Sequence, residues 1–441
     1  MKTIPRTATA ALAVLALVLA ACQSSASESP ETSMAPGESA GPLGGTISIL
    51  ATWTDTEQEN FLAMIQPWVD ANEVEVQYEG NRDLSTILTT RIEGGNPPDV
   101  AGLPNPGAMA EFARAGDTLD LSGVIDVETM AEEYNQGWID AGTVDGTFVG
   151  IFIKVSPKGL IWYNPEAFAA AEYEVPTDWA SFEALVDQIQ ADGTTPWGVG
   201  LESGGDSGWP GTDWVEDLVL RQSGPDAYDQ WVQGELAWSS PEIKAAFEAF
   251  GAWAADDAYV AGGPNNALSV NFGNGGDCLF GDPPGCYLHH QAGFMSSFFE
   301  TNFPDEAVGG ETYDFFPMPG DAFDGATASG DLFAMFRDTP QARSLMQYLI
   351  TADAQEIWVS RGGATTANSA VPLSAYPDEP SMAAAEGMIS ADVVRYDAGD
   401  LMPAQMGRAF FGAILDYVQN PANLDQILEE LDAVQAEAYG S

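Results

Sequence analysis

The sequence predicts an α/β protein in which short strands alternate with amphipathic helices around mainly parallel sheets. Two observations lead to this fold class. From residue 46 onward, short apolar or β-branched runs alternate with segments whose apolar residues recur at helical spacing. The chain of 441 residues is also 45% hydrophobic and 18% charged, which supplies a large core and suits two or three domains.

The first part of the folded chain shows the alternation most clearly. Its pattern predicts strands at 46–51, 74–78 and 99–103, and helices over 57–71 and 83–93. In a parallel sheet, ligands bind beyond the carboxyl ends of the strands. Site residues are therefore expected in the loops that follow these strands, at 52–56, 80–83 and 104–107.

The middle of the chain, over residues 150–320, has the pattern of a second α/β lobe. Strands are expected at 148–154 and 159–164, and helices near 177–189 and over 213–222 and 241–254. The last part adds a strand at 331–336 and amphipathic helices over 341–350, 354–358, 403–419 and 423–438.

The charge balance narrows the classes of function. The chain carries 66 acidic and 14 basic residues, for a formal net charge of -52. So few bases do not readily form the basic patch that a phosphate backbone needs, and an anionic membrane surface would repel the chain. We therefore expect no nucleic-acid partner. The acidity itself has two open interpretations: a solvated surface suited to a salty medium, or a role with cations.

The first 45 residues predict export. Lys2 and Arg6 precede an apolar stretch over 8–21, which is shorter than the roughly 20 residues that span a bilayer. It ends in Leu19-Ala20-Ala21-Cys22, which resembles the lipobox of bacterial lipoproteins. We expect residues 1–21 to be a lipoprotein signal peptide, Cys22 to be lipidated and 22–45 to be a flexible tether. The alternative is an ordinary signal peptide with an incidental cysteine.

The remaining cysteines and the histidines are expected to have structural roles. Lipidation of Cys22 leaves Cys278 and Cys286, which would pair as a disulfide in an oxidising setting, with two free thiols as the alternative. His289 and His290 are the only histidines. Adjacent residues on a strand point to opposite faces, so a shared metal ion is not expected.

Several ordered segments carry a resemblance to a known family. They are Trp53-Thr54-Asp55 after the first strand, then Gly95 to Val100, Ile161 to Pro165, Thr177 to Trp179, Gly330-Asp331 and Leu401 to Pro403. In this order, behind a lipobox, they resemble the extracellular solute-binding proteins (family 1) of carbohydrate ABC importers, the branch that includes maltose-binding protein. Two stretches are similar to the α-glucoside-binding lipoproteins: Asp213 to Asp217 and Cys286 to Gln291.

The resemblance implies a two-lobed periplasmic-binding-protein fold of type II, with hinge crossings and a central ligand cleft. By analogy, the crossings fall near 152–157, 325–329 and 376–384. Lobe 1 would hold 46–153 and 328–378, and lobe 2 would hold 156–325 and 384–441. The implied protein is a monomer without a cofactor or catalysis. It captures a mono- or oligosaccharide by lobe closure and delivers it to the transmembrane subunits of an ABC permease, while a lipid anchor holds it at the outer face of the bacterial cytoplasmic membrane.

The chemistry of a sugar suggests which side chains would hold it. Its apolar C–H faces need aromatic platforms, and its hydroxyls need charged or amide groups for paired hydrogen bonds. Bases are rare in this chain, so those at expected cleft positions are better indicators than the many acids. The candidates are Trp53, Asn81, Arg82, Lys154, Trp209, Asp213, Trp214, Gln291, Asp331, Arg361, Gly363 and Phe410.

Each candidate also has a structural interpretation. Core packing would explain Trp53 and Phe410, hinge structure would explain Lys154, and helix capping would explain Asp213. A secreted glycoside hydrolase is the alternative from another class, because it would need only two suitably spaced carboxylates. A binding protein for another solute, such as a polyamine or a peptide, is the third interpretation, since carboxylates with aromatic rings also hold cations.

Overall fold

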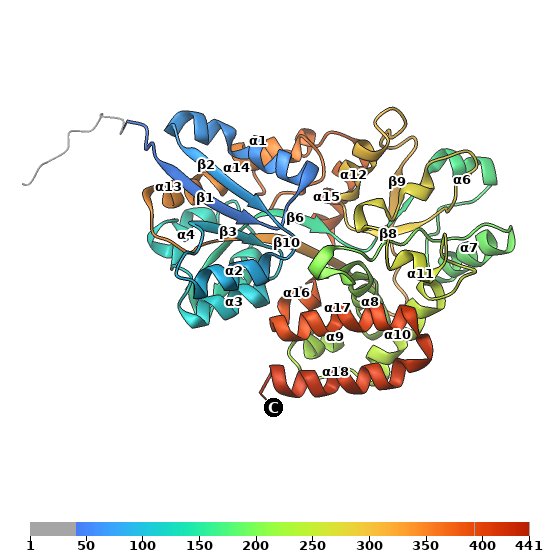
Figure 1. Ribbon diagram of the computed structural model, residues 1–441. Coiled ribbons are helices and arrows are strands. Elements are labelled where there is room, and N and C mark those ends of the chain that lie inside the picture. The colour runs from blue at the N-terminus through green and yellow to red at the C-terminus, as the bar shows by residue number, and fades with distance from the viewer. Residues whose placement is uncertain (1–40, 392, 441) are drawn as a thin grey trace, which may run out of the picture. The chain divides into compact units, whose positions relative to one another are not determined.

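The computed structural model describes residues 41–391 and 393–440, and residues from Pro42 onward form one compact unit. The predicted signal peptide, the lipidation site at Cys22 and nearly all of the tether lie outside the described residues. No described helix combines the length and the apolar character needed to cross a bilayer. Strands and helices alternate through most of the unit, so the α/β prediction is confirmed (Figure 1).

The larger sheet has six strands in the order β11-β10-β3-β1-β2, with β6 pairing to β10. Its strands are β1 (Thr46–Ala51), β2 (Glu75–Gly80), β3 (Val100–Leu103), β6 (Gly150–Pro157), β10 (Ala326–Met335) and β11 (Val394–Tyr396). The predicted parallel arrangement holds for β1 with β2 and β3. However, β10 runs antiparallel to β3 and β6, so the sheet is mixed. The carboxyl ends of β1, β2 and β3 therefore meet at one edge.

Helices from both ends of the chain accompany this sheet. They are α1 (Asp55–Asn72), α2 (Leu84–Glu93), α3 (Pro106–Ala115), α13 (Pro340–Leu349) and α14 (Ala352–Val359). Helix α1 packs against α13 and α14, although about 280 residues separate them in sequence (Figure 1). Their apolar faces and the sheet share one core, whose members lie between Ile47 and Val155 and between Leu332 and Ala367.

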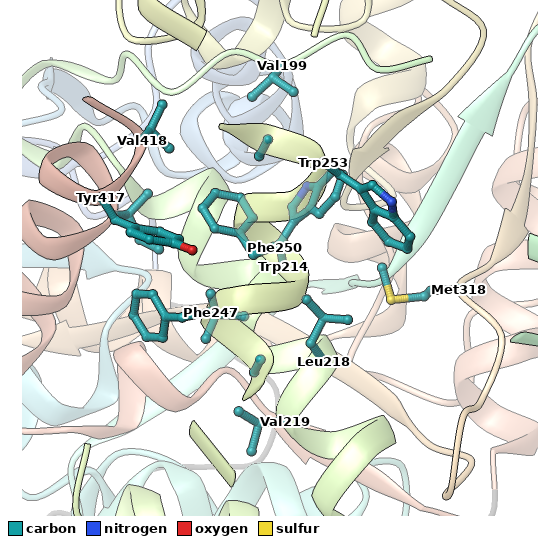
Figure 2. Packing of buried hydrophobic residues seen from close by; sticks show 14 of the residues in the cluster. Val199, Trp214, Leu218, Val219, Phe247, Phe250, Trp253, Met318, Tyr417 and Val418 are labelled. Carbon is teal, nitrogen blue, oxygen red and sulfur yellow. The ribbon is translucent and has the colours of Figure 1, made fainter. Parts of the chain in front are cut away.

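The second lobe is mostly helical and has a small antiparallel sheet. That sheet has the order β8-β7-β9, made by β7 (Leu160–Tyr163), β8 (His289–Gln291) and β9 (Asp314–Pro317). The main helices are α7 (Trp179–Ala191), α8 (Trp209–Ser223), α10 (Pro241–Ala254), α17 (Ala404–Gln419) and α18 (Leu424–Ala438). Their shared core draws its members from 161–318 and 398–431 and is rich in indole rings (Figure 2).

Shorter elements complete the chain. They are α4 (Val127–Met130), α5 (Gln136–Ala141), β4 (Thr143–Val144), β5 (Thr147–Phe148), α6 (Pro165–Ala171), α9 (Pro225–Val232), α11 (Pro264–Ala267), α12 (Met295–Asn302), α15 (Glu379–Ser390) and α16 (Ala398–Leu401). The predicted disulfide between Cys278 and Cys286 is present, so this prediction is confirmed. It closes a loop beside a small third core that contains Trp162 and Phe299.

One predicted helix begins earlier than its pattern indicated. Helix α8 starts at Trp209 rather than at Asp213, because Gly208 takes a left-handed conformation and Pro210 suits the first helical turn. Asp213 is consequently an interior helix residue, so the helix-capping interpretation of this side chain is wrong. One turn into the helix, its carboxylate accepts a hydrogen bond from Lys158, the residue directly after β6.

Candidate functional site

A cavity lies where the two lobes meet, and residues of both lobes line it. It holds about 1340 Å³ of space, counting the open solvent at its mouth. The three loops that follow β1, β2 and β3 all contribute to its lining, as expected from the shared edge of their strands. Strands β6 and β10 supply the floor, and the second lobe supplies the starts of α8 and α17 and the short helix α16.

One end of the cavity, which we call the Lys154 end, contains Trp53, Glu57, Arg82, Lys154 and Asp331. The Lys154 ammonium donates to Glu57 Oε1 at 2.6 Å and lies 3.4 Å from Asp331 Oδ2. Arg82 Nη2 donates to the other oxygen of Glu57 at 2.6 Å. The Trp53 indole donates to Asp331 Oδ2 at 3.2 Å. Two bases and two acids therefore form one balanced network on the floor and wall of the cavity.

Burial and charge act in opposite directions on the Lys154 end. Burial alone would raise the pKa of Glu57, but the Lys154 ammonium and the Arg82 guanidinium outweigh it and lower that pKa to about 2. Burial would lower the pKa of Lys154, yet Glu57 and Asp331 raise it above its ordinary value. Glu57 is thus ionised and Lys154 protonated at neutral pH. Each ammonium has three protons, so Lys154 keeps one for a ligand.

The other end, which we call the Lys158 end, is lined by Lys158, Asp213, Asp397 and Asp400. Glu216 does not line the cavity and is buried beside Asp213 and Asp397. Lys158 Nζ donates to Asp213 Oδ1 at 2.7 Å and to Asp397 Oδ2 at 2.8 Å. Glu216 accepts the backbone N–H groups of Ala398 and Gly399 at the start of α16, at 2.9 and 3.0 Å. Carboxylate oxygens of Asp213, Glu216 and Asp397 all lie within 4.8 Å of one another, a spacing that could hold a cation. Lys158 already supplies a positive charge there, because its ammonium pairs with Asp213 and Asp397.

The crowding of acids perturbs their pKa values. Burial raises the pKa of Asp213, Glu216 and Asp400 well above its ordinary range, and the neighbouring carboxylates add to this, while Lys158 opposes it. Burial would lower the pKa of Lys158, but the carboxylates raise it well above its ordinary value. The ammonium is therefore firmly protonated. The oxygen Asp213 Oδ2 is buried and has no hydrogen-bond partner among the described residues.

Aromatic rings cover both ends. Lys154 Nζ lies 5.5 Å from the centre of the Phe294 ring, and Arg82 Cζ lies 5.0 Å from that of Phe272. Lys158 Nζ lies 5.1 Å from the centre of the Trp209 ring. The ring centres of Trp209 and Phe272 lie 5.1 Å apart. Rings beside charged donors and acceptors give the cavity both kinds of surface that a sugar needs.

The mouth of the cavity brings two acids of different lobes together. Gly205, in the turn before α8, lies so close to Asp83 at the start of α2 that a Cβ atom there would sit 1.7 Å from Asp83 Oδ1. Burial and then the Asp83 carboxylate raise the pKa of Asp206 to about 6, while Arg82 and Arg408 lower it. The hydroxyls of Thr56 and Thr301 lie 3.1 Å apart across another part of the same seam. These contacts join residues of the two lobes beside the cavity.

Half of the predicted site residues line this cavity. Those that the structure brings together are Trp53, Arg82, Lys154, Trp209, Asp213 and Asp331. The lining does not include the other six, which are Asn81, Trp214, Gln291, Arg361, Gly363 and Phe410.

The structure places two of these aromatic residues in the second core instead. The centre of the Trp214 ring lies 4.6 Å from that of Trp197 and 4.8 Å from that of His290. Figure 2 shows Trp214 among other apolar side chains. Phe410 packs 4.8 Å from the Trp238 ring. Both lie on helix faces turned away from the cavity, so direct ligand contact is withdrawn for them. The indole at Trp209, five residues earlier on the same helix, takes the cavity position.

The four polar or small residues have local contacts. Asn81 Oδ1 accepts the Asp83 N–H at 2.8 Å in the turn before α2. Arg361 Nε donates to Asn60 Oδ1 at 2.7 Å, and Gly363 packs against Ser297. Gln291 Oε1 accepts the next backbone N–H at 2.9 Å. We therefore withdraw them from the candidate ligand contacts as well.

The histidine side chains also have separate structural partners. His289 Nδ1 lies 2.9 Å from the Gly198 carbonyl, and His290 Nε2 lies 2.8 Å from Asp217 Oδ2. Burial lowers the pKa of both, to about 4 for His289.

Several lining residues were missed from sequence. The main ones are Glu57, Lys158, Asp206, Phe272, Phe294, Asp397, Asp400, Arg408 and Phe411. Lys158 had a usable signal, because it is one of only four lysines and follows Lys154 by four residues, directly after β6. The acids had none, since 66 acidic residues make any single one uninformative. Phe272 begins a three-residue 3-10 helix and Phe294 directly precedes α12, and no periodic pattern in the sequence marks either position.

A ligand cavity between two α/β lobes, with contacts from both, defines the class of two-lobed solute receptors. Residues 54–356 match the family of bacterial extracellular solute-binding proteins, and the chain belongs to that family.

Two curated relatives are similar over nearly their whole length. The osmoprotective compounds-binding protein GgtB of Synechocystis sp. is 38% identical over 390 residues, which cover 88% of this chain and 91% of that protein. The alpha-glucosides-binding periplasmic protein AglE of Rhizobium meliloti is 35% identical over 395 residues, or 87% of this chain and 85% of that protein.

Solved structures confirm the fold. The bacterial solute receptor AcbH has a TM-score of 0.77 at 19% identity, over 89% of this chain and 98% of that one. A chitin oligosaccharide binding protein has a TM-score of 0.76 at 19% identity, over 90% of this chain and 99% of that one. The two-lobed fold with a central cleft, expected from the ordered segments, is thereby confirmed.

Proposed function

We propose that the protein is the sugar-capturing component of an ABC importer and that its ligand is an α-glucoside or a short oligosaccharide. The observation that carries the proposal is the cavity itself. It pairs an ammonium, carboxylates and aromatic faces at each end, on elements of both lobes. The α-glucosides named for one relative agree with this chemistry.

The two ends offer a sugar what it needs. A hydroxyl group both donates and accepts, so it can bridge an ammonium proton and a neighbouring carboxylate oxygen. At the Lys154 end, the remaining Lys154 proton and Asp331, which lies beside it, form such a pair. Charge-assisted bonds of this kind contribute about 1.5–3 kcal/mol each. The rings of Trp209 and Phe294 offer apolar faces for the C–H side of a sugar ring.

Closure of the lobes is the step that couples binding to transport. A ligand that touches both lobes stabilises the closed arrangement and shifts the population toward it. We propose that the chain crosses between lobes near 152–157, 325–329 and 376–384. Lobe 1 is then 46–153 with 328–378, and lobe 2 is 156–325 with 384–441.

The remaining parts of the proposal concern the setting. Cleavage before Cys22 and lipidation of this residue would hold a monomeric domain at the outer face of the cytoplasmic membrane. The tether over 22–45 would then let the loaded domain reach the permease subunits. The family's extracellular setting supports an exported site of action.

Calorimetric titration of the mature protein tests the function. Maltose, trehalose, sucrose and maltotriose are titrated in turn, and each mixture is afterwards analysed for released glucose. Saturable binding without product is the expected result. Product formation from any of these sugars would support a glycoside hydrolase instead, and binding of spermidine or a peptide in place of every sugar would support the third interpretation.

A matched pair of variants connects the result to the cavity. Lys154→Met removes the ammonium of the Lys154 end, whereas Lys244→Met removes an exposed ammonium that pairs with Asp425 on the surface. Sugar affinity is expected to fall at least about tenfold in the first variant and to stay unchanged in the second. Equal affinities in both variants would remove the Lys154 end from the site.

A further inference from the structure

A buried ion pair lies directly behind the Lys158 end of the cavity. Asp217 follows Asp213 by one turn of α8, on the same face of the helix, and its side chain is fully buried. Arg221, one further turn along, is also buried and donates from Nη1 to Asp217 Oδ1 at 2.8 Å. The lining of the cavity includes Asp213 but neither Asp217 nor Arg221, so this ion pair does not touch a ligand.

The Asp217 carboxylate also joins two strands. It accepts from the Thr327 hydroxyl on β10, and its Oδ2 lies 2.8 Å from His290 Nε2 on β8. Burial would raise the pKa of Asp217, but Arg221 and His290 outweigh it and lower that pKa to about 2. An ionised carboxylate has no proton to give, so His290 donates from Nε2. The second of the adjacent histidines therefore serves to hold this carboxylate.

Two successive residues of β10 hold both partners of one ion pair in the cavity. The Thr327 carbonyl accepts the backbone N–H of Lys158 at 2.8 Å, and the Ala328 carbonyl accepts that of Asp397 at 2.9 Å. The side chains of Lys158 and Asp397 then meet at 2.8 Å. The place of this ion pair thus depends on where one short piece of β10 lies.

The hydroxyl of Thr327 connects this piece of β10 to α8. It donates to Asp217 Oδ1, while the other oxygen of that carboxylate lies against Gly159, where a Cβ atom would sit 2.7 Å away. Gly159 directly follows Lys158, so one carboxylate contacts the chain on both sides of the Lys158 backbone. Asp213, one turn earlier on α8, holds the Lys158 ammonium. Apolar residues of similar volume often stabilise a core as well as a buried ion pair does, so stability alone does not account for this one.

We propose that Asp217 and Thr327 are positioning residues for sugar capture: their bond fixes β10 to α8 and so sets where the Lys158 ammonium lies in the cavity. Both act through Lys158, since neither lines the cavity. Arg221 and His290 hold the Asp217 carboxylate in the orientation that receives the Thr327 hydroxyl. The inference rests on the proposed function, because its consequence is a change in sugar affinity.

Removing the Thr327 hydroxyl tests this connection with little change in volume, and valine is well tolerated in strands. Thr327→Val is compared with Thr327→Ser, which keeps the hydroxyl. The matched control is Thr118→Val, because the Thr118 hydroxyl has no partner among the described residues and lies outside the cavity lining. Each variant is titrated in a calorimeter with whichever of maltose, trehalose and sucrose binds best to the native protein.

The loss of one hydrogen bond that positions the ammonium should weaken binding about fivefold in Thr327→Val. Thr327→Ser and Thr118→Val should bind the sugar as the native protein does. Native affinity in Thr327→Val would overturn the proposal. An equal loss in Thr327→Ser would overturn it as well, because the hydroxyl would then not be the cause.

A spectroscopic measurement without ligand separates this inference from the proposed function. Among the described lysines only Lys154 and Lys158 are buried, and a buried ammonium held by hydrogen bonds can be followed by proton–nitrogen correlation NMR. Lys154→Met identifies the Lys158 signal by elimination. That signal should shift in Thr327→Val and keep its native position in Thr118→Val.

An unshifted Lys158 signal in Thr327→Val would overturn the proposal, whatever the sugars do. Failure of every sugar to bind to the native protein, with the shift observed, would instead contradict the proposed function and leave the positioning of Lys158 established.

Discussion

Replacing Lys154 by Met tests the central ion network of the cavity. The ammonium is buried and is bonded to Glu57 and close to Asp331, so its removal leaves Glu57 with Arg82 alone and Asp331 with the Trp53 indole alone. Breaking a buried pair on one side costs about 3–5 kcal/mol, because the partner charge stays buried. The lowering of the Glu57 pKa from 4.5 to about 2, which Lys154 and Arg82 bring about together against burial, corresponds to about 3 kcal/mol and so to the same order of magnitude.

Urea unfolding at several pH values measures this free energy. The pKa of Glu57 is lower in the folded protein than in the unfolded chain, so its contribution is complete above pH 4.5 and is lost as the pH falls toward 2. The difference in unfolding free energy between the native protein and Lys154→Met should therefore be about 3–5 kcal/mol at pH 7 and should shrink below pH 4.5. A difference under about 1 kcal/mol at pH 7, the size expected for the surface variant Lys244→Met, would refute the reasoning.

The mouth and the second core allow three further predictions. Gly205→Ala should weaken sugar affinity by about threefold in calorimetry, because its Cβ would sit 1.7 Å from Asp83 Oδ1 and the Asp83 side chain would have to rotate away. The matched change Gly387→Ala, which meets nothing within 4 Å inside α15, should instead add about 0.5–1 kcal/mol of stability in thermal unfolding. Sugar affinity should rise as the pH falls through 6 toward 4, because burial and the Asp83 carboxylate of the other lobe raise the pKa of Asp206 from 3.8 to about 6, so that bringing the lobes together takes up a proton in this range. A titration series should show that Asp206→Asn removes this rise. Trp214→Ala should lower the unfolding free energy by about 3–5 kcal/mol, and an unchanged free energy would place its ring outside the core.

The local fold could be predicted well from sequence because its signals are local. Helix α10 begins and ends at the residues its apolar spacing indicated, and β1 matches its β-branched run. The antiparallel pairing of β10 with β3 and β6 could not be predicted in the same way, because the partners lie more than 170 residues apart and either direction buries the same side chains. Helix α15 was missed because its small alanines give little contrast between two faces.

The site was predictable only in part, for two physical reasons. Rare residue types gave a usable signal: Arg82, in the loop after β2, and Lys154, within β6, are two of only 14 basic residues, and both line the cavity. The two indoles of α8 could not be told apart, because the apolar spacing placed the helix start at Asp213 and left Trp209 outside the helix. Trp209 lines the cavity, whereas Trp214 is in the core. The position of Asp397 in the cavity could not be predicted, because it depends on a contact with Lys158, about 240 residues earlier in the chain.

The uneven placement of the tryptophans gives the protein an internal optical reporter. Of the twelve in the chain, five are packed together in the second core: Trp197, Trp214, Trp231, Trp238 and Trp253. Trp53 is sealed against Phe61 and Phe333, while Trp209 is partly accessible in the cavity wall. Fluorescence of the packed indoles should therefore report unfolding of the second core, and fluorescence of Trp209 should report ligand binding in the cavity. The speed of capture can then be recorded in a stopped-flow instrument without attaching a dye, with Trp209→Phe as the dark reference.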